Sequence, residues 1–530
     1  MDPLASLVES VLKKLLPDSA DLAIRPNEPK IVRDAVWGMV ELLRHECLIV
    51  DTPLFQRLRG VFQTGFTYLV YPCAVHSRFE HSLGCLHLAA RVIDRLATGE
   101  WDTRFSLELR LMVRLAALLH DVSHCVFSHV SEDVYRRDSR VRVGTNELRK
   151  LFPQGEKSAR IGAAEVLTYY MLTSKAFGRF FENVRKAVGD QCLPSGVTCE
   201  NIARLIIGLP PKEHADFKFV SQIINGPFDI DKVDYQTRDG YFTGVTMPVD
   251  KERLVSSLCI CDNKRGQYEM VVDHRGIAPI EQLLFNRMLL YDSAYHHHKI
   301  RAATKLFERA VDDPAALPLE WLLEHDEYDF FGLNGVPRHL YPVIRRLRHR
   351  NIPFRAAIIH GSSINPCSDE DSTDWKRIIK KLFSPDEVDQ DDAKRWFDEL
   401  DDAIRRKLGK GLEDSFYVDL PKPPKYMTIQ QGSKIKFSDG HLATLDEVFP
   451  LNSTLNTYAQ QCKYRIYVFA EEIARYAVAA AAYSALKDVG IQLNKDAFRL
   501  AKLDPERVRE NLNGEAIPDR ASDEGSWAFQ

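Results

Sequence analysis

The sequence has no long apolar run that is free of charge. Its most apolar stretch, residues 467–486, contains Glu471 and Arg475, whereas a membrane-spanning helix needs about 20 predominantly apolar residues in succession. We therefore expect a packed helix there and no membrane anchor. Near the start of the chain, Glu9 and Lys13 interrupt the leucine pattern, which excludes the apolar core of a secretory signal.

Cysteine and net positive charge are also scarce. The ten cysteines among 530 residues are scattered, and the closest pair, Cys259 and Cys261, lacks zinc-finger spacing. No disulfide framework is implied, so we expect a reduced, cytoplasmic protein. The formal net charge is −4, so nothing indicates nucleic acid as a partner, although a local basic groove would still permit it. We find no internal repeat.

The apolar pattern is mainly helical. Between residues 31 and 310, strand candidates are short, as in Gly65–Tyr71 and Gln267–Val272, where aromatic and β-branched residues cluster. Residues 385–408 are predicted to form a charged helix. Residues 415–449 show the alternation of strands and contain turn residues. We predict a mainly α fold, with a helical core that carries short β-hairpins (residues 1–310) and a smaller C-terminal region (residues 311–530) that is helical and α+β.

One apolar helix ends in polar residues that can do chemistry. Leucines recur at helical spacing from Leu107 to Leu119, and His120 and Asp121 follow directly. An unpaired carboxylate beside so much leucine would be costly, whereas a cation held by imidazole and carboxylate would satisfy both groups. The alternative is an ordinary helix end with a solvated His-Asp pair, a dipeptide that is common by chance.

Other histidines and aspartates accompany this pair in a particular order. His81 precedes it and Asp231 follows it at a distance. This order of histidine, histidine-aspartate and distant aspartate resembles the HD metal-dependent phosphohydrolases, in the branch of the deoxynucleoside triphosphate triphosphohydrolases. Matching stretches lie at residues 34–38, 51–59 and 295–298.

The resemblance implies an HD-domain helical core. It also implies hydrolysis of a deoxynucleoside triphosphate to deoxynucleoside and inorganic triphosphate, by an enzyme that assembles as a homo-oligomer.

The resemblance also implies the metal ligands His81, His120, Asp121 and Asp231. Two imidazoles and two carboxylates suit manganese, iron, magnesium, nickel or zinc, and the residue types do not choose among them. The cation would neutralise charge at phosphorus and activate a water. The alternative is a family member that has lost its metal.

Further residues match the family's phosphate contacts. Arg78 shares a helix face with His81, and by similarity Arg78, Lys232 and Arg287 would clamp the phosphates. The histidine at the place of His124 would protonate the departing 5′-oxygen or stabilise charge near the α-phosphate, with His129 close behind. The alternatives are a solvated surface arginine for Arg78 and a structural histidine for His129.

A sugar pocket is implied in the same way. Gln63 matches a glutamine that binds the 3′-hydroxyl, Tyr235 would lie near the phosphates and the sugar, and Tyr295 would pack against the sugar. Asp239 would brace the sugar site or a neighbouring residue. Arg287, Tyr291 and Tyr295 are spaced to line one side of a helix. The alternatives are a core aromatic stripe for the tyrosines and a plain helix salt bridge for Asp239.

Three departures from the family pattern keep other hypotheses open. A family histidine is missing near residues 152–161, where Glu156 stands close to the place of a family glutamate. Thr64 follows the sugar-site glutamine where a bulky aliphatic residue is common. His298 stands where a phosphate-binding lysine is common, and we expect it to be only partly protonated at neutral pH. The alternatives are hydrolysis of a ribonucleotide, a modified nucleotide or a nucleic-acid 3′ end, and a nucleotide-binding regulator with little turnover.

Overall fold

The computed structural model describes residues 2–17, 28–153, 161–245, 248–263, 266–313, 315–365, 377–378, 381, 387–421, 434–449, 458, 463–513 and 515–519. The chain divides into two compact units. The first contains Met1–Leu290, Glu308–Ile344 and Thr428–Phe449, and the second contains Tyr291–Phe307, Arg345–Met427 and Pro450–Gln530. The units interleave along the chain, whereas the sequence predicts one boundary at residue 310. That boundary stays a prediction.

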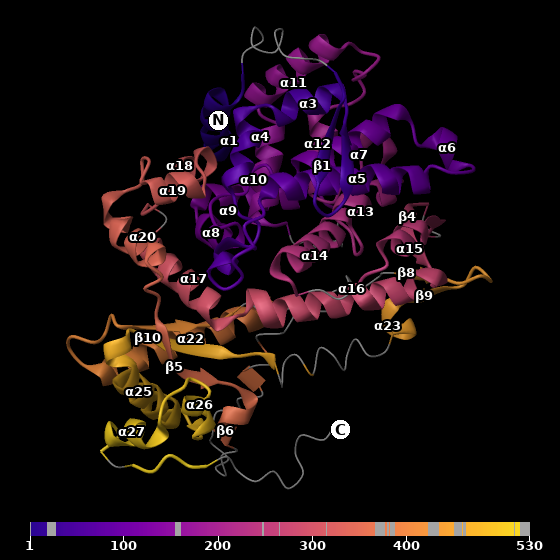
Figure 1. The fold of residues 1–530 in the computed structure, drawn as a ribbon. Coiled ribbons are helices and arrows are strands. Elements are labelled where there is room, and N and C mark those ends of the chain that lie inside the picture. Colours follow the sequence, from indigo (N-terminus) through magenta and orange to yellow (C-terminus); the bar gives the residue numbers. More distant parts are fainter. Residues whose placement is uncertain are drawn as a thin grey trace. The chain divides into compact units, whose positions relative to one another are not determined.

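The first unit is mainly helical (Figure 1). Its longer helices, with at least ten residues each, are α1 (Pro3–Leu15), α5 (Arg78–Leu96), α7 (Leu107–Leu119), α9 (Ser139–Arg149), α10 (Ala163–Leu172), α11 (Lys175–Val188), α14 (Ile230–Thr243) and α16 (Ile277–Leu290). Its shorter helices are α3 (Arg44–Val50), α4 (Pro53–Gln56), α6 (Trp101–Arg104), α8 (His129–Tyr135), α12 (Cys199–Ile206), α13 (Lys218–Ile224), α15 (Lys251–Ser256), α18 (Leu319–Glu324), α19 (Glu327–Gly332) and α23 (Leu445–Val448).

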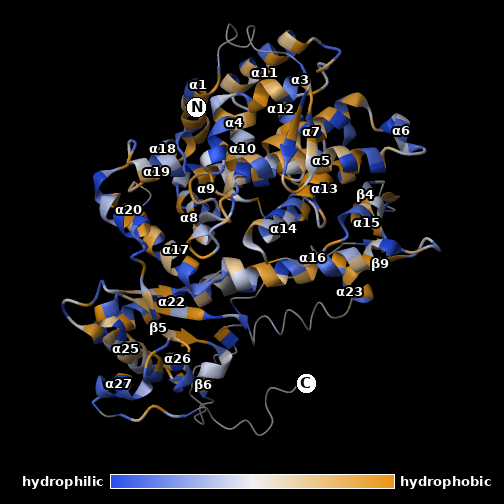
Figure 2. Ribbon diagram, in the orientation of Figure 1, coloured by the Kyte–Doolittle hydropathy of each residue, from blue (hydrophilic) through white to orange (hydrophobic). Residues whose placement is uncertain are grey.

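The apolar helix predicted from the leucine spacing lies at the centre of this unit. It is α7, which begins at the N-cap Ser106 and packs against α5, α12 and α13. Most of its residues are buried, and Leu115, Leu118 and Leu119 are fully so. Figure 2 shows hydrophobic residues along the helices of this unit, as expected for helices that bury one side. The predicted mainly α fold is confirmed.

Two small sheets complete the first unit. Strands β1 (Lys30–Asp34) and β2 (Gly38–Leu42) form an antiparallel hairpin. The other sheet has the order β3-β4-β8-β9, with β3 (Leu258–Asp262), β4 (Tyr268–Asp273), β8 (Lys434–Lys436) and β9 (Leu442–Thr444). The strand predicted at Gln267–Val272 is confirmed as β4.

The strand predicted at Gly65–Tyr71 is wrong, because residues Gly65–Leu69 form a 3₁₀-helix. Gly65, Phe66 and Thr67 are all buried, so the alternating burial of a strand is absent. Phe66 stacks on Phe127 at 4.2 Å between ring centroids. Tertiary packing has therefore outweighed the β-propensity of the aromatic residues.

The second unit is α+β. Its main sheet has the order β5-β10-β7, with β5 (Phe354–Ile359), β10 (Ile466–Ala470) and β7 (Phe416–Asp419), and a smaller sheet pairs β6 (Ile364–Asn365) with β11 (Gln492–Leu493). Its helices are α22 (Glu387–Leu408), α25 (Arg475–Asp488), α26 (Asp496–Arg499) and α27 (Pro505–Glu510). Two further helices, α17 (His298–Ala310) and α20 (Tyr341–Arg348), have residues in both units.

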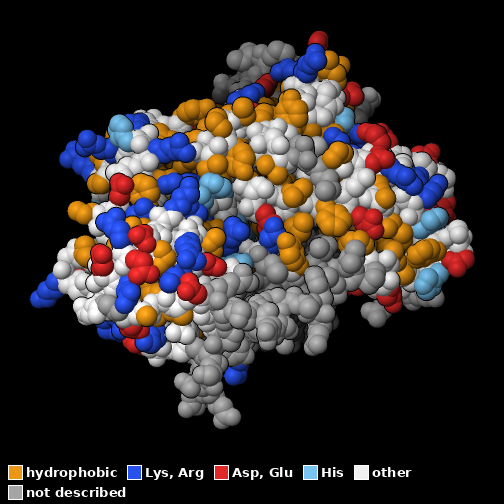
Figure 3. Space-filling model, turned by 60° about the horizontal axis from the view of Figure 1, so that its bottom comes forward, with side chains coloured by type: hydrophobic (Ala, Val, Ile, Leu, Met, Phe, Trp, Pro, Cys, Tyr) orange, Lys and Arg blue, Asp and Glu red, His pale blue; other side chains and the backbone are white. Residues whose placement is uncertain are grey.

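The apolar stretch at residues 467–486 is only partly the helix predicted from the sequence. Residues up to Ala470 belong to strand β10, and the alanine-rich part forms α25, which packs against α22 and β5. No described helix is long and apolar enough to cross a membrane. On the coloured part of the face in Figure 3, basic and acidic side chains are interspersed, in keeping with the small net charge.

Candidate metal centre

Three helices of the first unit carry the predicted metal ligands. His81 lies in the first turn of α5, which opens with a capping box formed by Ser77 and Glu80. His120 is the C-cap residue of α7, and Asp231 lies in the first turn of α14, whose N-cap is Asp229. Helix α5 packs against both α7 and α14. Capping therefore fixes the N-terminal ends of α5 and α14, which carry His81 and Asp231.

The four predicted ligands converge. Nε2 of His81 lies 3.1 Å from Oδ1 of Asp231 and 3.4 Å from Oδ2 of Asp121. Nε2 of His120 lies 3.4 Å from Oδ1 of Asp121 and 3.9 Å from Oδ1 of Asp231. Donor atoms bound to one ion, each about 2.0–2.2 Å from it, are separated by distances of this kind. The cluster could therefore hold a divalent cation.

Hydrogen bonds on the far side of each imidazole set its tautomer. Nδ1 of His120 lies 2.8 Å from the carbonyl oxygen of Ala117, which only accepts, so Nδ1 carries the proton. Nδ1 of His81 lies 2.7 Å from Oδ2 of Asp234. The Nε2 atoms are therefore the ring nitrogens directed at the cluster. Burial alone would lower the pKa of His81, but Asp231 and Asp234 raise it well above its ordinary value, so a cation bound at Nε2 would replace a proton there. Nε2 of His120 is buried and has no hydrogen-bond partner among the described residues, as expected of a metal ligand.

The two carboxylates of the cluster are ionised. Burial alone would raise the pKa of Asp121, but the Arg78 guanidinium, together with His120 and His124, holds it well below its ordinary value. Burial would likewise raise the pKa of Asp231, and the adjacent His81 and His120 lower it. Two anionic oxygens therefore face two imidazole nitrogens, which is a suitable donor set for a divalent cation.

Arg78 lies beside the cluster and is not the solvated surface arginine of the alternative hypothesis. It is 2% exposed, Nη1 donates to Oδ2 of Asp121 at 2.5 Å, and Nε donates to Oγ of Ser128 at 3.0 Å. Lys232 instead pairs with Asp229, and its Nζ donates to the carbonyl of Gly226 at 2.8 Å.

The two histidines after the cluster differ in exposure. His124 is buried, its Nε2 lies 3.2 Å from Oδ1 of Asp121, and burial together with Arg78 lowers its pKa to about 4. His129 has a side chain that is 72% exposed, and its Nδ1 lies 3.0 Å from Oε2 of Glu132. The two rings are in edge contact, with 5.4 Å between their centroids.

Three predicted sugar contacts lie in the first unit. Gln63 is 6% exposed, and its Oε1 has no hydrogen-bond partner within the described ranges. Tyr235 is half-buried on α14, one turn after Asp231. Asp239 is buried and bonds Nε2 of His76 at 2.7 Å, so it braces a neighbouring residue.

The predicted helix face of Arg287, Tyr291 and Tyr295 is interrupted. Helix α16, which carries Arg287, ends at Leu290, and Tyr291–Tyr295 form a π-helical turn, so the three residues do not share one regular α-helix. Tyr295 packs on Tyr291 within the second unit, 5.1 Å between ring centroids.

His298 also belongs to the second unit. Burial and the nearby Arg355 lower the pKa of His298 to about 3. It is therefore neutral at neutral pH and not partly protonated as the sequence analysis expected. Glu156 and the place of the missing histidine fall within residues 154–160, which lie outside the described residues.

Several residues beside the cluster were not predicted from the sequence. Asp234 holds His81 and is itself bonded by Arg238, whose Nε donates to Oδ2 of Asp234 at 2.9 Å and whose Nη1 donates to Oδ2 of Asp34 at 2.8 Å. Nε1 of Trp37 also donates to Asp234. Asp234 lies at i+3 from Asp231, so helical spacing was an available signal, but Asp34 comes from the distant strand β1.

Glu327 contacts two loops of the same unit. Its Oε1 accepts from the backbone N–H of Phe62 at 2.8 Å and of Phe127 at 2.9 Å. Phe127 and Ser128 have φ of +59° and +51°, a conformation that is costly for residues other than glycine. Oγ of Ser128 accepts from Arg78 and donates to the carbonyl of Phe62. Glu327 therefore helps to fix the turn against which Arg78 rests.

Glu327 predicts a pH dependence of stability. Burial raises its pKa to about 8 from an ordinary 4.5, so the folded protein binds a proton there that the unfolded chain releases, and folding loses stability as pH rises from 4.5 towards 8. Glu327→Gln keeps the acceptor without ionising. We expect it to gain stability relative to the wild type between about pH 6 and pH 8, measured as urea unfolding midpoints.

The matched control is Glu320→Gln, at a half-exposed glutamate on α18 that pairs with Arg140, which should not reproduce the stability gain of Glu327→Gln between about pH 6 and pH 8. Identical pH profiles for Glu327→Gln and the wild type would contradict this account. The charged and titratable groups that interact with Glu327 are Arg57, Tyr68, Cys125 and Asp326.

Comparisons with known proteins agree with this geometry. The HD-domain family model matches residues 78–188, and the model of an HD-associated region matches residues 249–496. The chain is 25% identical over 439 residues to an uncharacterized protein of Methanocaldococcus jannaschii, covering 80% of this chain and 76% of that one. It is 29% identical over 275 residues to the human deoxynucleoside triphosphate triphosphohydrolase SAMHD1, covering 52% of this chain and 43% of that relative.

A solved structure has the same fold. It is the crystal structure of a hypothetical protein from Aquifex aeolicus, with a TM-score of 0.59 and 21% identity, over 86% of this chain and 99% of that chain. At this identity the likeness concerns the fold alone. The chain spans less than half of the length of the human triphosphohydrolase, so the activity of that whole protein is not transferred by the match.

Proposed function

Because the chain belongs to the HD-domain phosphohydrolase family, we propose that it hydrolyses deoxynucleoside triphosphates to deoxynucleoside and inorganic triphosphate. The observation that carries the proposal is the convergence of His81, His120, Asp121 and Asp231. A divalent cation bound there supplies charge neutralisation at phosphorus and lowers the pKa of a coordinated water.

The roles of the chain's own residues follow from their contacts. His81 and His120 offer Nε2, and Asp121 and Asp231 offer carboxylate oxygens. Arg78 is held beside Asp121 with a planar guanidinium that suits phosphate oxygens. We assign Lys232 and Arg287 to the phosphates. By similarity we assign Gln63 and Tyr295 to the sugar, Tyr235 to the phosphates and sugar, and His298 to the place of a phosphate lysine. Asp239, which bonds His76, is assigned to brace the sugar site.

The reaction needs one water and one proton transfer. The water oxygen bonds to the α-phosphorus, the bond from the α-phosphorus to the 5′-oxygen breaks, and a proton reaches the 5′-oxygen. We assign His124 and His129 to this part of the reaction. His124 is neutral at neutral pH, because burial and Arg78 lower its pKa to about 4, so its role is a hydrogen bond to the developing charge, and His129 is the candidate proton donor. The His129–Glu132 pair orients the exposed imidazole.

One observation favours a second candidate substrate. Thr64 has a hydroxyl that is buried and has no hydrogen-bond partner in the described part of the chain, next to Gln63, whose Oε1 is equally unpartnered. A hydroxyl group at this position can accept a hydrogen bond from the 2′-hydroxyl of a ribonucleotide or donate one to it. A ribonucleoside or modified nucleoside triphosphate is therefore the alternative substrate, and a regulator with little turnover is the alternative function.

A nucleotide panel tests the proposal. The full chain, loaded with manganese, is incubated with each deoxyribonucleotide and ribonucleotide, and the products are separated by chromatography. We expect deoxynucleoside and inorganic triphosphate in equal amounts, with ribonucleotides turned over more slowly. Stepwise release of monophosphate would contradict the reaction. Equal rates for the two sugars would favour the second substrate class, and tight binding without product would favour the regulator.

We further propose a cytoplasmic homo-oligomer. The support for the compartment is that the described cysteines are free thiols: Cys47, Cys73, Cys85, Cys125, Cys192, Cys199, Cys259 and Cys261, as is usual in a reducing compartment. Light scattering of the full chain in solution tests the assembly, and a monomer with full activity would contradict it.

A further inference from the structure

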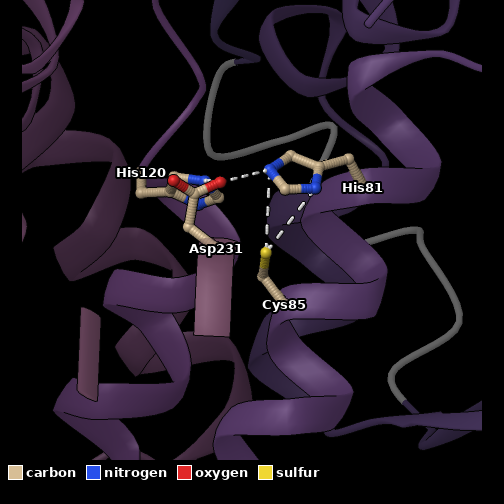
Figure 4. A group of neighbouring side chains, drawn as sticks. All are labelled: His81, Cys85, His120 and Asp231. Atoms are coloured by element: carbon tan, nitrogen blue, oxygen red, sulfur yellow. Dashed lines mark hydrogen bonds and ion pairs between the residues drawn. The ribbon is translucent and has the colours of Figure 1, made fainter. Parts of the chain in front are cut away.

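A thiol lies beside the predicted metal ligands. Cys85 follows His81 by one turn of α5, so both side chains are on the same helix face. Sγ of Cys85 lies 3.7 Å from Nε2 and 3.8 Å from Nδ1 of His81. Figure 4 shows the sulfur of Cys85 below the His81 ring, with His120 and Asp231 to one side of that ring. One donor atom from each of these residues lies within 4.8 Å of the others.

We propose that Cys85 is a further donor to the metal centre and that it biases the centre towards cations that accept sulfur, such as zinc, iron(II) and cobalt(II), over magnesium and manganese. Thiolate is a soft ligand that selects such metals, whereas magnesium prefers carboxylate and water oxygens. This inference rests on the metal centre of the proposed function.

The separation of the two ligand atoms is close to that required by a shared ion. Zinc lies about 2.3 Å from a thiolate sulfur and about 2.0–2.1 Å from an imidazole nitrogen, which places the two ligand atoms about 3.1–3.5 Å apart at angles between a right angle and the tetrahedral angle. The observed 3.7 Å from Sγ of Cys85 to Nε2 of His81 exceeds that range slightly. Because Sγ is about equally far from Nδ1, at 3.8 Å, ligation requires the cysteine side chain to turn from the side of the ring towards the ion at Nε2.

The charges also balance. When the metal binds, the thiol proton is released to solvent and the sulfur donates its electron pair to the ion. Asp121, Asp231 and the thiolate then carry three negative charges, while the divalent ion and the Arg78 guanidinium carry three positive ones. Within this set of donors, ion and Arg78 the charges cancel, which lowers the cost of burying the thiolate. Among the described residues, Sγ of Cys85 also makes a weak contact, 4.0 Å from the carbonyl oxygen of Ile230.

Spectroscopy of the full chain tests the inference without relying on turnover. Cobalt(II)-loaded wild type is expected to have a sulfur-to-cobalt charge-transfer band in the near ultraviolet. X-ray absorption of the zinc-loaded wild type is expected to require a sulfur neighbour at about 2.3 Å. In Cys85→Ser the charge-transfer band should disappear while the visible cobalt bands persist. The affinity for zinc should fall at least about 10-fold, and the affinity for manganese should change little.

The matched control is Cys47→Ser, which removes a buried thiol on α3 whose Sγ contacts the carbonyl of Leu42. It should leave the spectra and the affinities unchanged. If Cys85→Ser fails to fold, Cys85→Ala takes its place in the same measurements. Bound cobalt without a sulfur band in the wild type would overturn the inference while leaving the proposed function intact. A wild type that binds neither cobalt nor manganese would overturn both.

Discussion

The Asp231→Asn variant is expected to lose its divalent cation and its turnover together. Asparagine keeps the shape of the side chain but removes the charge 3.1 Å from Nε2 of His81. Loss of groups that merely orient metal ligands costs about 10–100-fold in metal affinity or activity, so loss of a direct ligand should cost at least about 100-fold. Metal content after dialysis, cation titration and product formation from nucleotide are the measurements.

The fold should survive this change. Asp231 is the least buried member of the cluster, with a side chain that is 37% exposed. Asp94→Asn is the matched control, because Asp94 lies on α5 with a side chain that is 79% exposed. It should keep wild-type metal content and rate. An Asp231→Asn protein that retained both would count against the metal centre.

The Arg238→Ala variant is expected to be strongly destabilised. Arg238 is completely buried and bonds both Asp34 and Asp234. Removing the guanidinium leaves two buried carboxylates without their counter-ion. Breaking a buried ion pair in this way lowers the free energy of unfolding by about 3–5 kcal/mol. We expect a large fall in the urea unfolding midpoint of the full chain. We also expect weaker metal binding, because Asp234 orients His81.

Arg91→Ala is the matched control for this prediction. Arg91 lies on α5 and pairs with the exposed Glu252 at the surface. Exposed pairs contribute about 0–1 kcal/mol, so its unfolding midpoint should stay close to that of the wild type. Equal destabilisation by the two substitutions would show that the buried network does not have the role assigned to it.

Local periodicity was enough to predict some of the fold. The leucine spacing before His120 predicted α7, and the distance of Arg78 from His81 predicted that they share the first turn of α5. Such signals are contained in one helix and need no information from the rest of the chain. The joining of His81 to Asp231, which are 150 positions apart in the sequence, came from the resemblance to a family and not from periodicity.

Non-local partners could not be predicted in this way. Asp34 meets Arg238 across 204 positions, and Glu327 meets Phe127 across 200. Each pairing depends on how distant elements pack. The 3₁₀-helix at Gly65–Leu69 was mistaken for a strand for the same reason, because stacking of Phe66 on Phe127 is a tertiary contact. Cys85 was overlooked although its helical spacing from His81 was visible.

The most direct test of the central claim is an anomalous difference map from crystals of the full chain soaked in manganese. The account predicts one strong peak within ligand distance of Nε2 of His81, Nε2 of His120 and the carboxylates of Asp121 and Asp231, and no such peak for Asp231→Asn. A map with bound manganese elsewhere, and nothing among these four side chains, would contradict it.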